Sequence, residues 1–272
     1  MNSQPDASTP ASPESPGSQG LRLRCGYGTD RGLRRETNED SFIAADPVFA
    51  VADGMGGHEA GEVASGICVR TLAGILQLDA GGRDVTAGVV QQYLFAADTG
   101  IREATGSRAG TTLSGVVAVE QLGVPYWLVL NIGDSRTYRL SHGRLAQLSV
   151  DHSEVQELLD AGRISRAQAA VHPRRHVVTR ALGTGDEAEA DYWLLPIQDG
   201  DRILVCSDGL TGELDDDQIA RILTSEAGPQ AAVDELIEAA LRSGGRDNVT
   251  AIVVDAQTPA GPDSADRTTA TM

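Results

Sequence analysis

The stretch "VADGMGGHEAGEVAS", residues 51–65, joins three local patterns at one point of the chain. The apolar run "VFAVA" leads into it with the composition of a buried strand, and Asp53 follows directly. A glycine-rich turn containing His58 comes next, and a helix is predicted to begin after it. The carboxylate either belongs to an ordinary tight turn or supplies an oxygen ligand to something bound in the space that the glycines leave open.

Other carboxylates also occur at the ends of predicted strands, beside Gly, Ser or Asn. They come from the motifs "TNEDSF", "VLNIGDSR", "ILVCSDGL" and "GGRDNVT", and they are Glu39, Asp40, Asp134, Asp208 and Asp247. If these strands lie side by side, the carboxylates converge with Asp53 at one edge of the sheets.

A cluster of carboxylates without partners repels itself and needs cations to be tolerated. Because the ligands are oxygen atoms without His or Cys, hard ions such as Mg²⁺ or Mn²⁺ suit the cluster. Two such ions about 3.5–4 Å apart can share a bridging hydroxide that is nucleophilic at neutral pH. The acidic motifs together therefore indicate a two-metal site, although any one of them alone is typical of a plain turn.

The hydrophobic patterns predict many strands in hairpin-like succession, with helices inserted in pairs. The predicted strands are 21–28, 41–45, 48–52, 113–119, 126–132, 136–140, 144–149, 191–196, 202–207 and 249–255. The predicted helices are 59–78, 84–104, 215–225 and 229–243, and residues 153–176 read as short helices and loop. Strict alternation of strand and helix is missing, so two mostly antiparallel sheets with helices outside are expected rather than a parallel doubly wound sheet.

Length and composition favour one domain. The chain has 272 residues, of which 40% are hydrophobic, and residues 21–256 form one continuous globular pattern without a linker. Residues 1–20 and 257–272 are rich in Ser, Pro, Gly and Thr and contain little to bury, so both segments are expected to be disordered.

The composition disfavours several classes of partner and chemistry. A formal charge of -17, from 39 acidic and 22 basic residues, disfavours nucleic acid and anionic lipid. The chain contains no lysine, which excludes Schiff-base chemistry and a P-loop lysine.

The cysteines and the lack of a long apolar run fit a soluble cytoplasmic protein without a membrane anchor. There are three cysteines without CxxC spacing, and no apolar run approaches 18 residues. Nothing indicates oligomerisation, so a monomer is expected.

Over roughly residues 22–255 the chain resembles the PP2C-type (PPM family) metal-dependent serine/threonine protein phosphatases in their compact bacterial form. The resemblance rests on a series of motifs in the order of the family. They are "DRGLRRETNEDS", "ADGMGGHEAGEVAS", "GTTL", "NIGDSR", "DHS", "TRALG", "SDGLTG" and "GGRDNVT".

The resemblance implies an α+β fold, a four-layer αββα sandwich with the metal site at one end of two central sheets. It implies two core Mn²⁺ or Mg²⁺ ions, bridged by Asp53, and a third, weaker ion. The implied ligands are Glu39, Asp40, Asp53, the Gly54 carbonyl, Asp134, Asp208 and Asp247. Arg35, four residues before Glu39, matches the phosphate-binding arginine of the family, and a guanidinium fork suits a phosphate dianion.

The implied reaction is hydrolysis of phosphoserine and phosphothreonine in proteins, opposing serine/threonine kinases. A metal-bridging hydroxide attacks phosphorus in line, the alkoxide leaves, and no phosphoenzyme forms. Positioning and charge neutralisation carry most of the catalysis, as in other phosphoryl transfers.

Several roles stay open at this stage. His58 is either the proton donor to the leaving group or a residue that caps the following helix or orders water near the metals. In "HPRRH", Arg174 and Arg175 either contact the substrate or belong to a solvated loop. Thr111 and Thr112 are expected to support their strand rather than perform chemistry.

Three rival functions are weighed against the phosphatase. A non-catalytic phosphatase-like regulatory domain would bind only a partner, but such domains usually lose metal aspartates. A metal hydrolase of small phosphate esters would use the same site. The C-x5-R spacing from Cys25 to Arg31 resembles that of cysteine phosphatases, but Cys25 falls on an inward position of an alternating strand.

Overall fold

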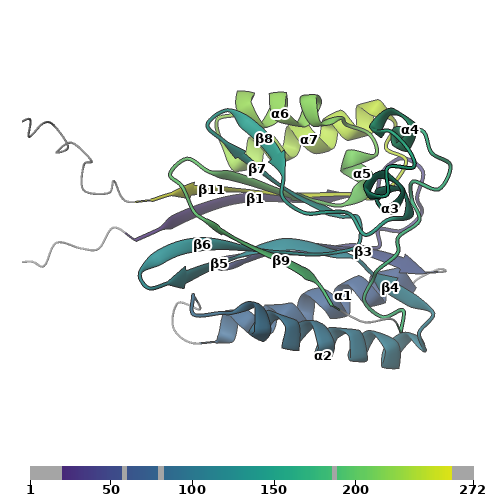
Figure 1. Ribbon diagram of the computed structural model, residues 1–272, viewed down its shortest axis with the longest axis horizontal. Helices are drawn as coiled ribbons and strands as arrows, with labels where there is room; N and C mark the ends of the chain where they lie inside the picture. Colours follow the sequence, from purple (N-terminus) through teal and green to yellow (C-terminus); the bar gives the residue numbers. More distant parts are fainter. Residues whose placement is uncertain (1–19, 57–59, 79–82, 186–188, 259–272) are drawn as a thin grey trace, which may run out of the picture.

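The computed structural model describes residues 20–56, 60–78, 83–185 and 189–258. These ranges contain two antiparallel sheets that lie face to face, with a pair of helices on the outer side of each (Figure 1). The predicted four-layer αββα sandwich is therefore confirmed. The segments predicted to be disordered fall almost entirely outside the described residues.

One sheet has five strands in the order β1-β11-β10-β7-β8. Their bounds are Arg22–Asp30 (β1), Val249–Gln257 (β11), Arg202–Cys206 (β10), Arg136–Ser141 (β7) and Arg144–Gln147 (β8). The other sheet has the order β2-β3-β5-β6-β9, with β4 paired to β3. Their bounds are Asp40–Ala45 (β2), Val48–Gly56 (β3), Ala109–Thr111 (β4), Leu113–Gln121 (β5), Val124–Ile132 (β6) and Asp191–Pro196 (β9).

The facing sides of the two sheets form the central core. Phe49 and Trp127 of one sheet are 1% and 0% exposed, and they pack in one cluster with Ile203, Ile252 and Val254 of the other sheet. Because successive side chains of a strand point to opposite faces, the same strands also supply the cores beneath the helices.

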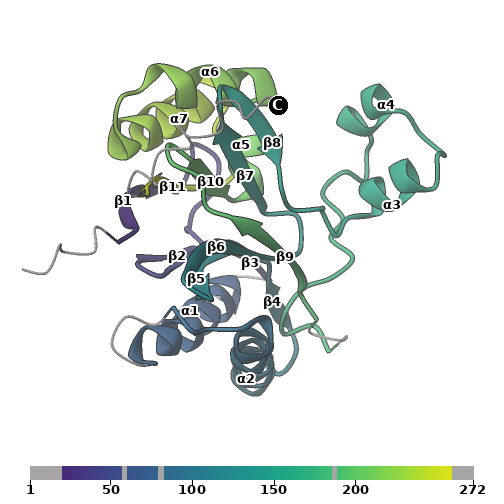
Figure 2. The ribbon, with the colours of Figure 1, turned by 60° about the vertical axis from the view of Figure 1, so that its left-hand side comes forward.

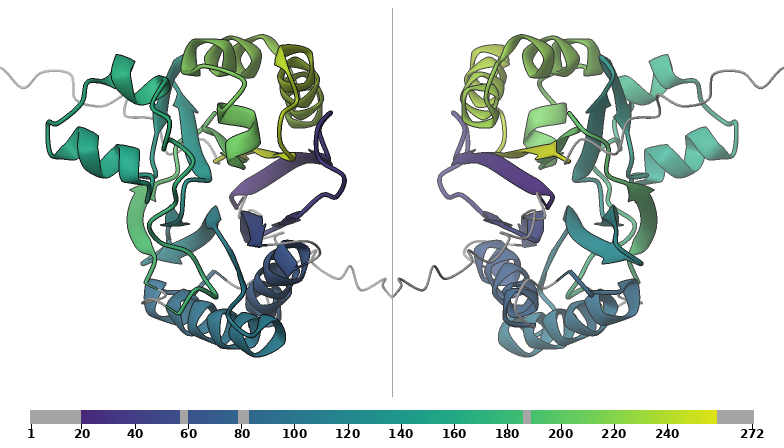
Figure 3. Two further views of the ribbon diagram at one scale, coloured as in Figure 1. Left: turned by 90° about the vertical axis from the view of Figure 1, so that its right-hand side faces the viewer. Right: turned by 90° about the vertical axis from the view of Figure 1, so that its left-hand side faces the viewer.

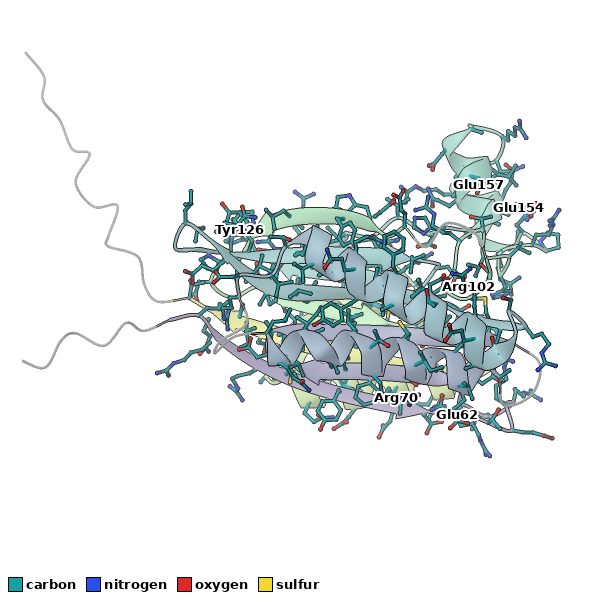
Figure 4. The ribbon with its side chains drawn as sticks, turned by 90° about the horizontal axis from the view of Figure 1, so that it is seen from below. Glu62, Arg70, Arg102, Tyr126, Glu154 and Glu157 are labelled. Atoms are coloured by element: carbon teal, nitrogen blue, oxygen red, sulfur yellow. The ribbon has the colours of Figure 1, made fainter. Side chains whose placement is uncertain are left out.

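The helix pairs cover the outer faces of the sheets (Figure 3). Helices α1 (Ala60–Leu72) and α2 (Ala87–Thr105), with a short 3₁₀ helix at Ala73–Gln77, cover the sheet that contains β3. Figure 4 views this layer from outside, with Glu62 and Arg70 on α1 and Arg102 on α2. Helices α6 (Asp216–Ser225) and α7 (Pro229–Ser243) cover the other sheet, and they bury the apolar stripes that predicted them.

Two short helices, α3 (Glu154–Asp160) and α4 (Arg166–Ala170), project sideways from the sandwich (Figure 2). We call these helices, together with the loop after them to residue 176, the flap. A further short helix, α5 (Asp208–Thr211), follows β10 at the same end of the molecule. The flap thus stands beside the end of the sheets where the acidic motifs lie. None of the helices in the described part of the chain combines the length and apolar composition that crossing a membrane requires.

Tyr27 departs from its expected burial. The alternation of β1 predicts an inward side chain, and the ring does lie against Phe42 of the other sheet, with centroids 5.3 Å apart. However, Tyr27 is 49% exposed. The reason is the position of β1 at the edge of its sheet, where only one neighbouring strand covers it.

Candidate metal centre

A cavity of about 570 Å³ opens at one end of the two sheets. Its lining brings together most of the predicted site residues from strands that are far apart in the sequence. These are Arg35, Glu39, Asp53, Gly54, Asp134, Asp208 and Asp247, together with Arg175 of the flap. The cavity is wide enough to hold a phosphorylated side chain.

Asp53 is fixed by its place in the sheet. It pairs with Asp40 across the β2–β3 ladder, which puts these two carboxylates on neighbouring strands. The Asp53 N–H donates to Thr112 Oγ1 at 3.1 Å, and Thr112 N–H donates to the Asp53 carbonyl at 2.9 Å. Thr111 Oγ1 donates to the same carbonyl at 2.9 Å. Both threonines therefore hold the backbone that presents the carboxylate.

Gly54 allows three backbone segments to meet beside Asp53. A Cβ on Gly54 would lie 2.3 Å from the Gly61 carbonyl oxygen of α1 and 2.5 Å from the Glu39 carbonyl oxygen. These distances exclude any side chain. The glycine therefore keeps the start of α1 and the Glu39 loop against the strand that carries Asp53.

Asp40 lies behind the cavity and is only 9% exposed. Its Oδ2 accepts hydrogen bonds from Ser207 Oγ at 2.8 Å and from Thr250 Oγ1 at 2.6 Å. Its Oδ1 is buried and has no hydrogen-bond partner among the described residues. Burial raises the pKa of Asp40 to about 7, although the two hydroxyl groups act to lower it. One oxygen of this carboxylate is therefore held in place while the other is left for a ligand.

The carboxylates destabilise one another's charged forms. Burial is the largest cause that raises the pKa of Asp53 well above its ordinary value, and the neighbouring charges raise it further, first that of Asp40 and then those of Asp208, Asp134 and Asp247. Burial, followed by the charge of Asp208, raises the pKa of Asp134 to about 8. Divalent cations would offset this repulsion.

The residues fit hard divalent cations. The donors are carboxylate oxygens with a backbone carbonyl nearby, and a buried oxygen of Asp40 lacks a partner in the described residues. Within the same ranges, no three or more His, Cys, Asp or Glu side chains form a finished ligand set.

Arg35 is the cation of the cavity rim. Its Nη2 donates to Asp247 Oδ2 at 2.5 Å, and this hydrogen bond raises the pKa of the guanidinium. The Arg35 side chain lines the cavity and is 53% exposed, so its remaining donors are accessible to a ligand. An arginine held against one predicted metal ligand can reach a phosphoryl group bound beside that ligand.

The two flap arginines differ in position. Arg175 lines the cavity, whereas Arg174 is not in its lining and instead forms an ion pair with Glu154 of α3 at 2.5 Å. Arg175 has no ion-pair or side-chain hydrogen-bond partner within the described ranges. His58, which the sequence left open as a proton donor or as a residue that caps the helix or orders water, lies outside the described residues.

Sequence reasoning missed two residues of the site. His176 lines the cavity with Nδ1 3.6 Å from Asp208 Oδ2, and the interaction with Asp208 raises its pKa. Asn248 accepts from the Glu39 N–H at 2.8 Å and donates to the carbonyls of Arg31 and Thr37. The only sequence signal for these residues was their nearness to motifs already singled out, "HPRRH" and "GGRDNVT".

Comparisons with known proteins agree with this geometry. A profile described as "Protein phosphatase 2C" matches residues 28–243. The chain is 40% identical over 246 residues to the serine/threonine protein phosphatase PstP of Mycobacterium tuberculosis, covering 86% of this chain and 45% of that relative. It is 36% identical over 244 residues to the serine/threonine phosphatase stp of Listeria monocytogenes, covering 84% of this chain and 94% of the relative. The chain thus spans just under half the length of the mycobacterial relative.

Solved structures of serine/threonine phosphatases also match this chain in fold. The crystal structure of the M. tuberculosis phosphatase PstP matches with a TM-score of 0.79 and 40% identity, over 86% of this chain and 99% of that one. A structure of the catalytic domain of PstP in complex with two manganese ions matches with a TM-score of 0.77 and 37% identity, over 87% of this chain and 99% of that one.

Proposed function

Because this chain belongs to the protein phosphatase 2C family, we propose that it is a metal-dependent serine/threonine protein phosphatase that hydrolyses phosphoserine and phosphothreonine in proteins. The observation that carries the proposal is one cavity lined by Asp53, Asp208, Asp247 and Arg35. Carboxylates that bind cations and an arginine that binds phosphate both serve metal-assisted phosphoryl transfer to water. The chain retains both.

The proposed ligands follow from the lining. Asp53, Asp208 and Asp247, with the Gly54 carbonyl, would hold two core ions, and Asp134 with Asp208 would hold a third. Glu39 and Asp40 would complete the surroundings of the core ions. When bound, two Mn²⁺ or Mg²⁺ ions neutralise phosphoryl charge and make a water nucleophilic at neutral pH. The manganese complex of a similar catalytic domain supports this choice of metal.

Within this chain, the work of Arg35 is to bind and orient the phosphoryl group. Its guanidinium can donate two parallel hydrogen bonds to phosphoryl oxygens while the contact with Asp247 fixes its position. Thr112 and Thr111 keep the Asp53 backbone from shifting when charge enters the cavity. Preorganised groups of this kind stabilise the transition state because they need no rearrangement during the reaction.

The finer assignments are also proposals. The substrates would be phosphoproteins produced by serine/threonine kinases, and the protein would act as a monomer in the cytoplasm. The formal charge of -17 argues against nucleic acid and anionic membrane as partners. The three cysteines are free thiols, which agrees with a reducing compartment.

The test is hydrolysis of a phosphothreonine peptide by the purified full chain, first with Mn²⁺ and then with excess EDTA. Activity should appear with the metal and disappear with the chelator. Asp53→Asn and Asp208→Asn should each abolish turnover in a protein that stays folded by circular dichroism. Substantial activity in both variants would refute the assigned site. A folded protein that neither turns over nor binds Mn²⁺ in calorimetry would instead support the non-catalytic binding domain.

A further inference from the structure

A second cavity lies between the flap and the body of the protein, with a volume of about 970 Å³. We call it the flap groove. Its flap side is formed by α3, α4 and the loop between them, and its body side by the segments after β6 and β8 and by the α5–α6 region. Figure 2 shows α3 and α4 standing away from the body on this side.

The flap groove is continuous with the candidate metal centre. Both cavities are lined by Asp134, Arg175, His176, Asp208 and Gly212. A phosphorylated side chain held at the metal centre would therefore have its own backbone at the mouth of the groove. The groove exceeds the metal-centre cavity in volume, so it can hold several residues of an extended polypeptide.

Part of the groove lining is apolar. Val155 and Ala169 of the flap are each 8% exposed, and Leu214 of the body is 3% exposed. Leu159 and Ile164 of the flap complete this apolar strip, and both are half-buried. An apolar side chain of a bound polypeptide that packs here removes from water the apolar surface that is still exposed, which belongs chiefly to Leu159 and Ile164.

The body side of the groove carries negative charge that the protein does not neutralise itself. Asp151 is neutralised, because Arg136 donates to it through Nε and Nη2 at 2.7 to 3.1 Å. By contrast, Asp215 and Asp216 have no arginine or histidine within ion-pair distance in the described part of the chain. Asp215 accepts from the Gln218 N–H, and Asp216 accepts from the Tyr138 hydroxyl at 3.2 Å.

The arginine side chains of the groove lining that lack a carboxylate partner among the described residues lie away from the body wall. Arg175 stands where the two cavities join, close to the place of the phosphoryl group, and Arg166 lies on the flap side. The carboxylates of Asp215 and Asp216 therefore make the body wall negative beyond the junction, at which Arg175 lies beside Asp134 and Asp208. An acidic flank would be repelled by this wall, and a basic flank would be attracted.

We propose that the flap groove binds the polypeptide next to the phosphorylated residue, with an apolar side chain on its apolar strip and a basic side chain against Asp215 and Asp216. The proposal rests on the phosphatase function proposed above and names its substrate class. The preferred substrates are phosphoproteins whose phosphosite is flanked on one side by apolar and basic residues.

The first experiment uses a phosphothreonine peptide with alanine flanks and versions with Arg, Leu or Glu at each flanking position in turn. The full chain is assayed with Mn²⁺, and p-nitrophenyl phosphate serves as a substrate without a flank. Arg and Leu on one side of the phosphothreonine should raise kcat/KM, each by about two- to fivefold, and Glu should lower it.

The second experiment compares Asp216→Asn with Asp217→Asn. Both changes remove one exposed carboxylate from the first turn of α6, but only Asp216 lines the groove. Asparagine can still accept the hydrogen bond from Tyr138, so the fold should be kept. Asp216→Asn should reduce the gain from the Arg flank about two- to fivefold, while Asp217→Asn leaves it unchanged and both retain wild-type activity on p-nitrophenyl phosphate.

Each failure has its own signature. No Mn²⁺-dependent hydrolysis of any substrate would overturn the phosphatase function and the groove proposal with it. Activity on p-nitrophenyl phosphate and on all peptides alike, without a flank effect, would overturn only the groove. A preference for Glu, or equal losses in Asp216→Asn and Asp217→Asn, would overturn the charge assignment of the body wall.

Discussion

His152 should stabilise the turn that presents Asp134, and its replacement by leucine tests this. The His152 N–H donates to the Gly133 carbonyl at 2.8 Å, and the Gly133 N–H donates back to Nδ1 of the ring at 3.1 Å. The other ring nitrogen, Nε2, lies 3.3 Å from Asp191 Oδ2. Since Nδ1 accepts a hydrogen bond, the ring is the neutral tautomer that carries its proton on Nε2.

The magnitude follows from these contacts. Leucine removes the acceptor for the Gly133 N–H, which is buried, and an unsatisfied buried donor costs about 1–3 kcal/mol. The contact with Asp191, which is 44% exposed, adds about 1 kcal/mol or less. We therefore expect His152→Leu to lower the free energy of unfolding by about 2–3 kcal/mol in urea titrations followed by circular dichroism. Asp191→Asn keeps the Gly133 contact and weakens the partly exposed contacts of Asp191 with His152 and Arg180, so as a control it should cost about 1 kcal/mol or less.

The pH dependence gives an independent check. Burial lowers the pKa of His152 below its ordinary value of 6.5, so the folded state prefers the neutral ring. The stabilising contribution should be fully present above pH 6.5 and should be lost as the pH falls from there toward the folded pKa. Between pH 7.5 and about 5, wild type should therefore lose more stability than His152→Leu. Equal pH slopes, or a cost of His152→Leu no larger than that of Asp191→Asn, would refute the reasoning.

Three further outcomes are expected. Arg175→Ala should lower kcat/KM for a phosphothreonine peptide by about tenfold, because Arg175 lines the cavity. Arg174→Ala loses only a contact within the flap and should change kcat/KM less than about threefold. Equal effects of the two variants would contradict the assignment of Arg175 alone to the substrate cavity. Gly54→Ala should cost more than about 2 kcal/mol of unfolding free energy and abolish Mn²⁺ binding in calorimetry, because a Cβ there meets backbone oxygen at 2.3 Å. Burial raises the pKa of the Cys68 and Cys206 thiols to about 12, so both should resist a thiol reagent at pH 8 until urea unfolds the protein, and labelling of either in the native state would argue against their burial.

The sequence by itself determined the elements and the acidic motifs at their ends. Alternating apolar residues predict strands, and apolar residues at helical spacing predict α2 and α7, because these periods are properties of the backbone. The link between Asp53 and a buried strand also follows from local pattern, but the predicted strand end at residue 52 is wrong, because β3 continues through Asp53 to Gly56 and pairs there with β4. The family motifs depend on the same short stretches, so the αββα sandwich could be predicted before any contact was known.

Only the tertiary structure decided which partners each site residue meets. Asp40 receives hydroxyl groups from Ser207 and Thr250, which lie 167 and 210 positions away in the chain. Arg174 and Arg175 are adjacent in sequence, yet one pairs with α3 while the other enters the cavity. Hydrophobic periodicity and turn residues do not predict these contacts, because the contacts result from how the two sheets and the flap pack against one another.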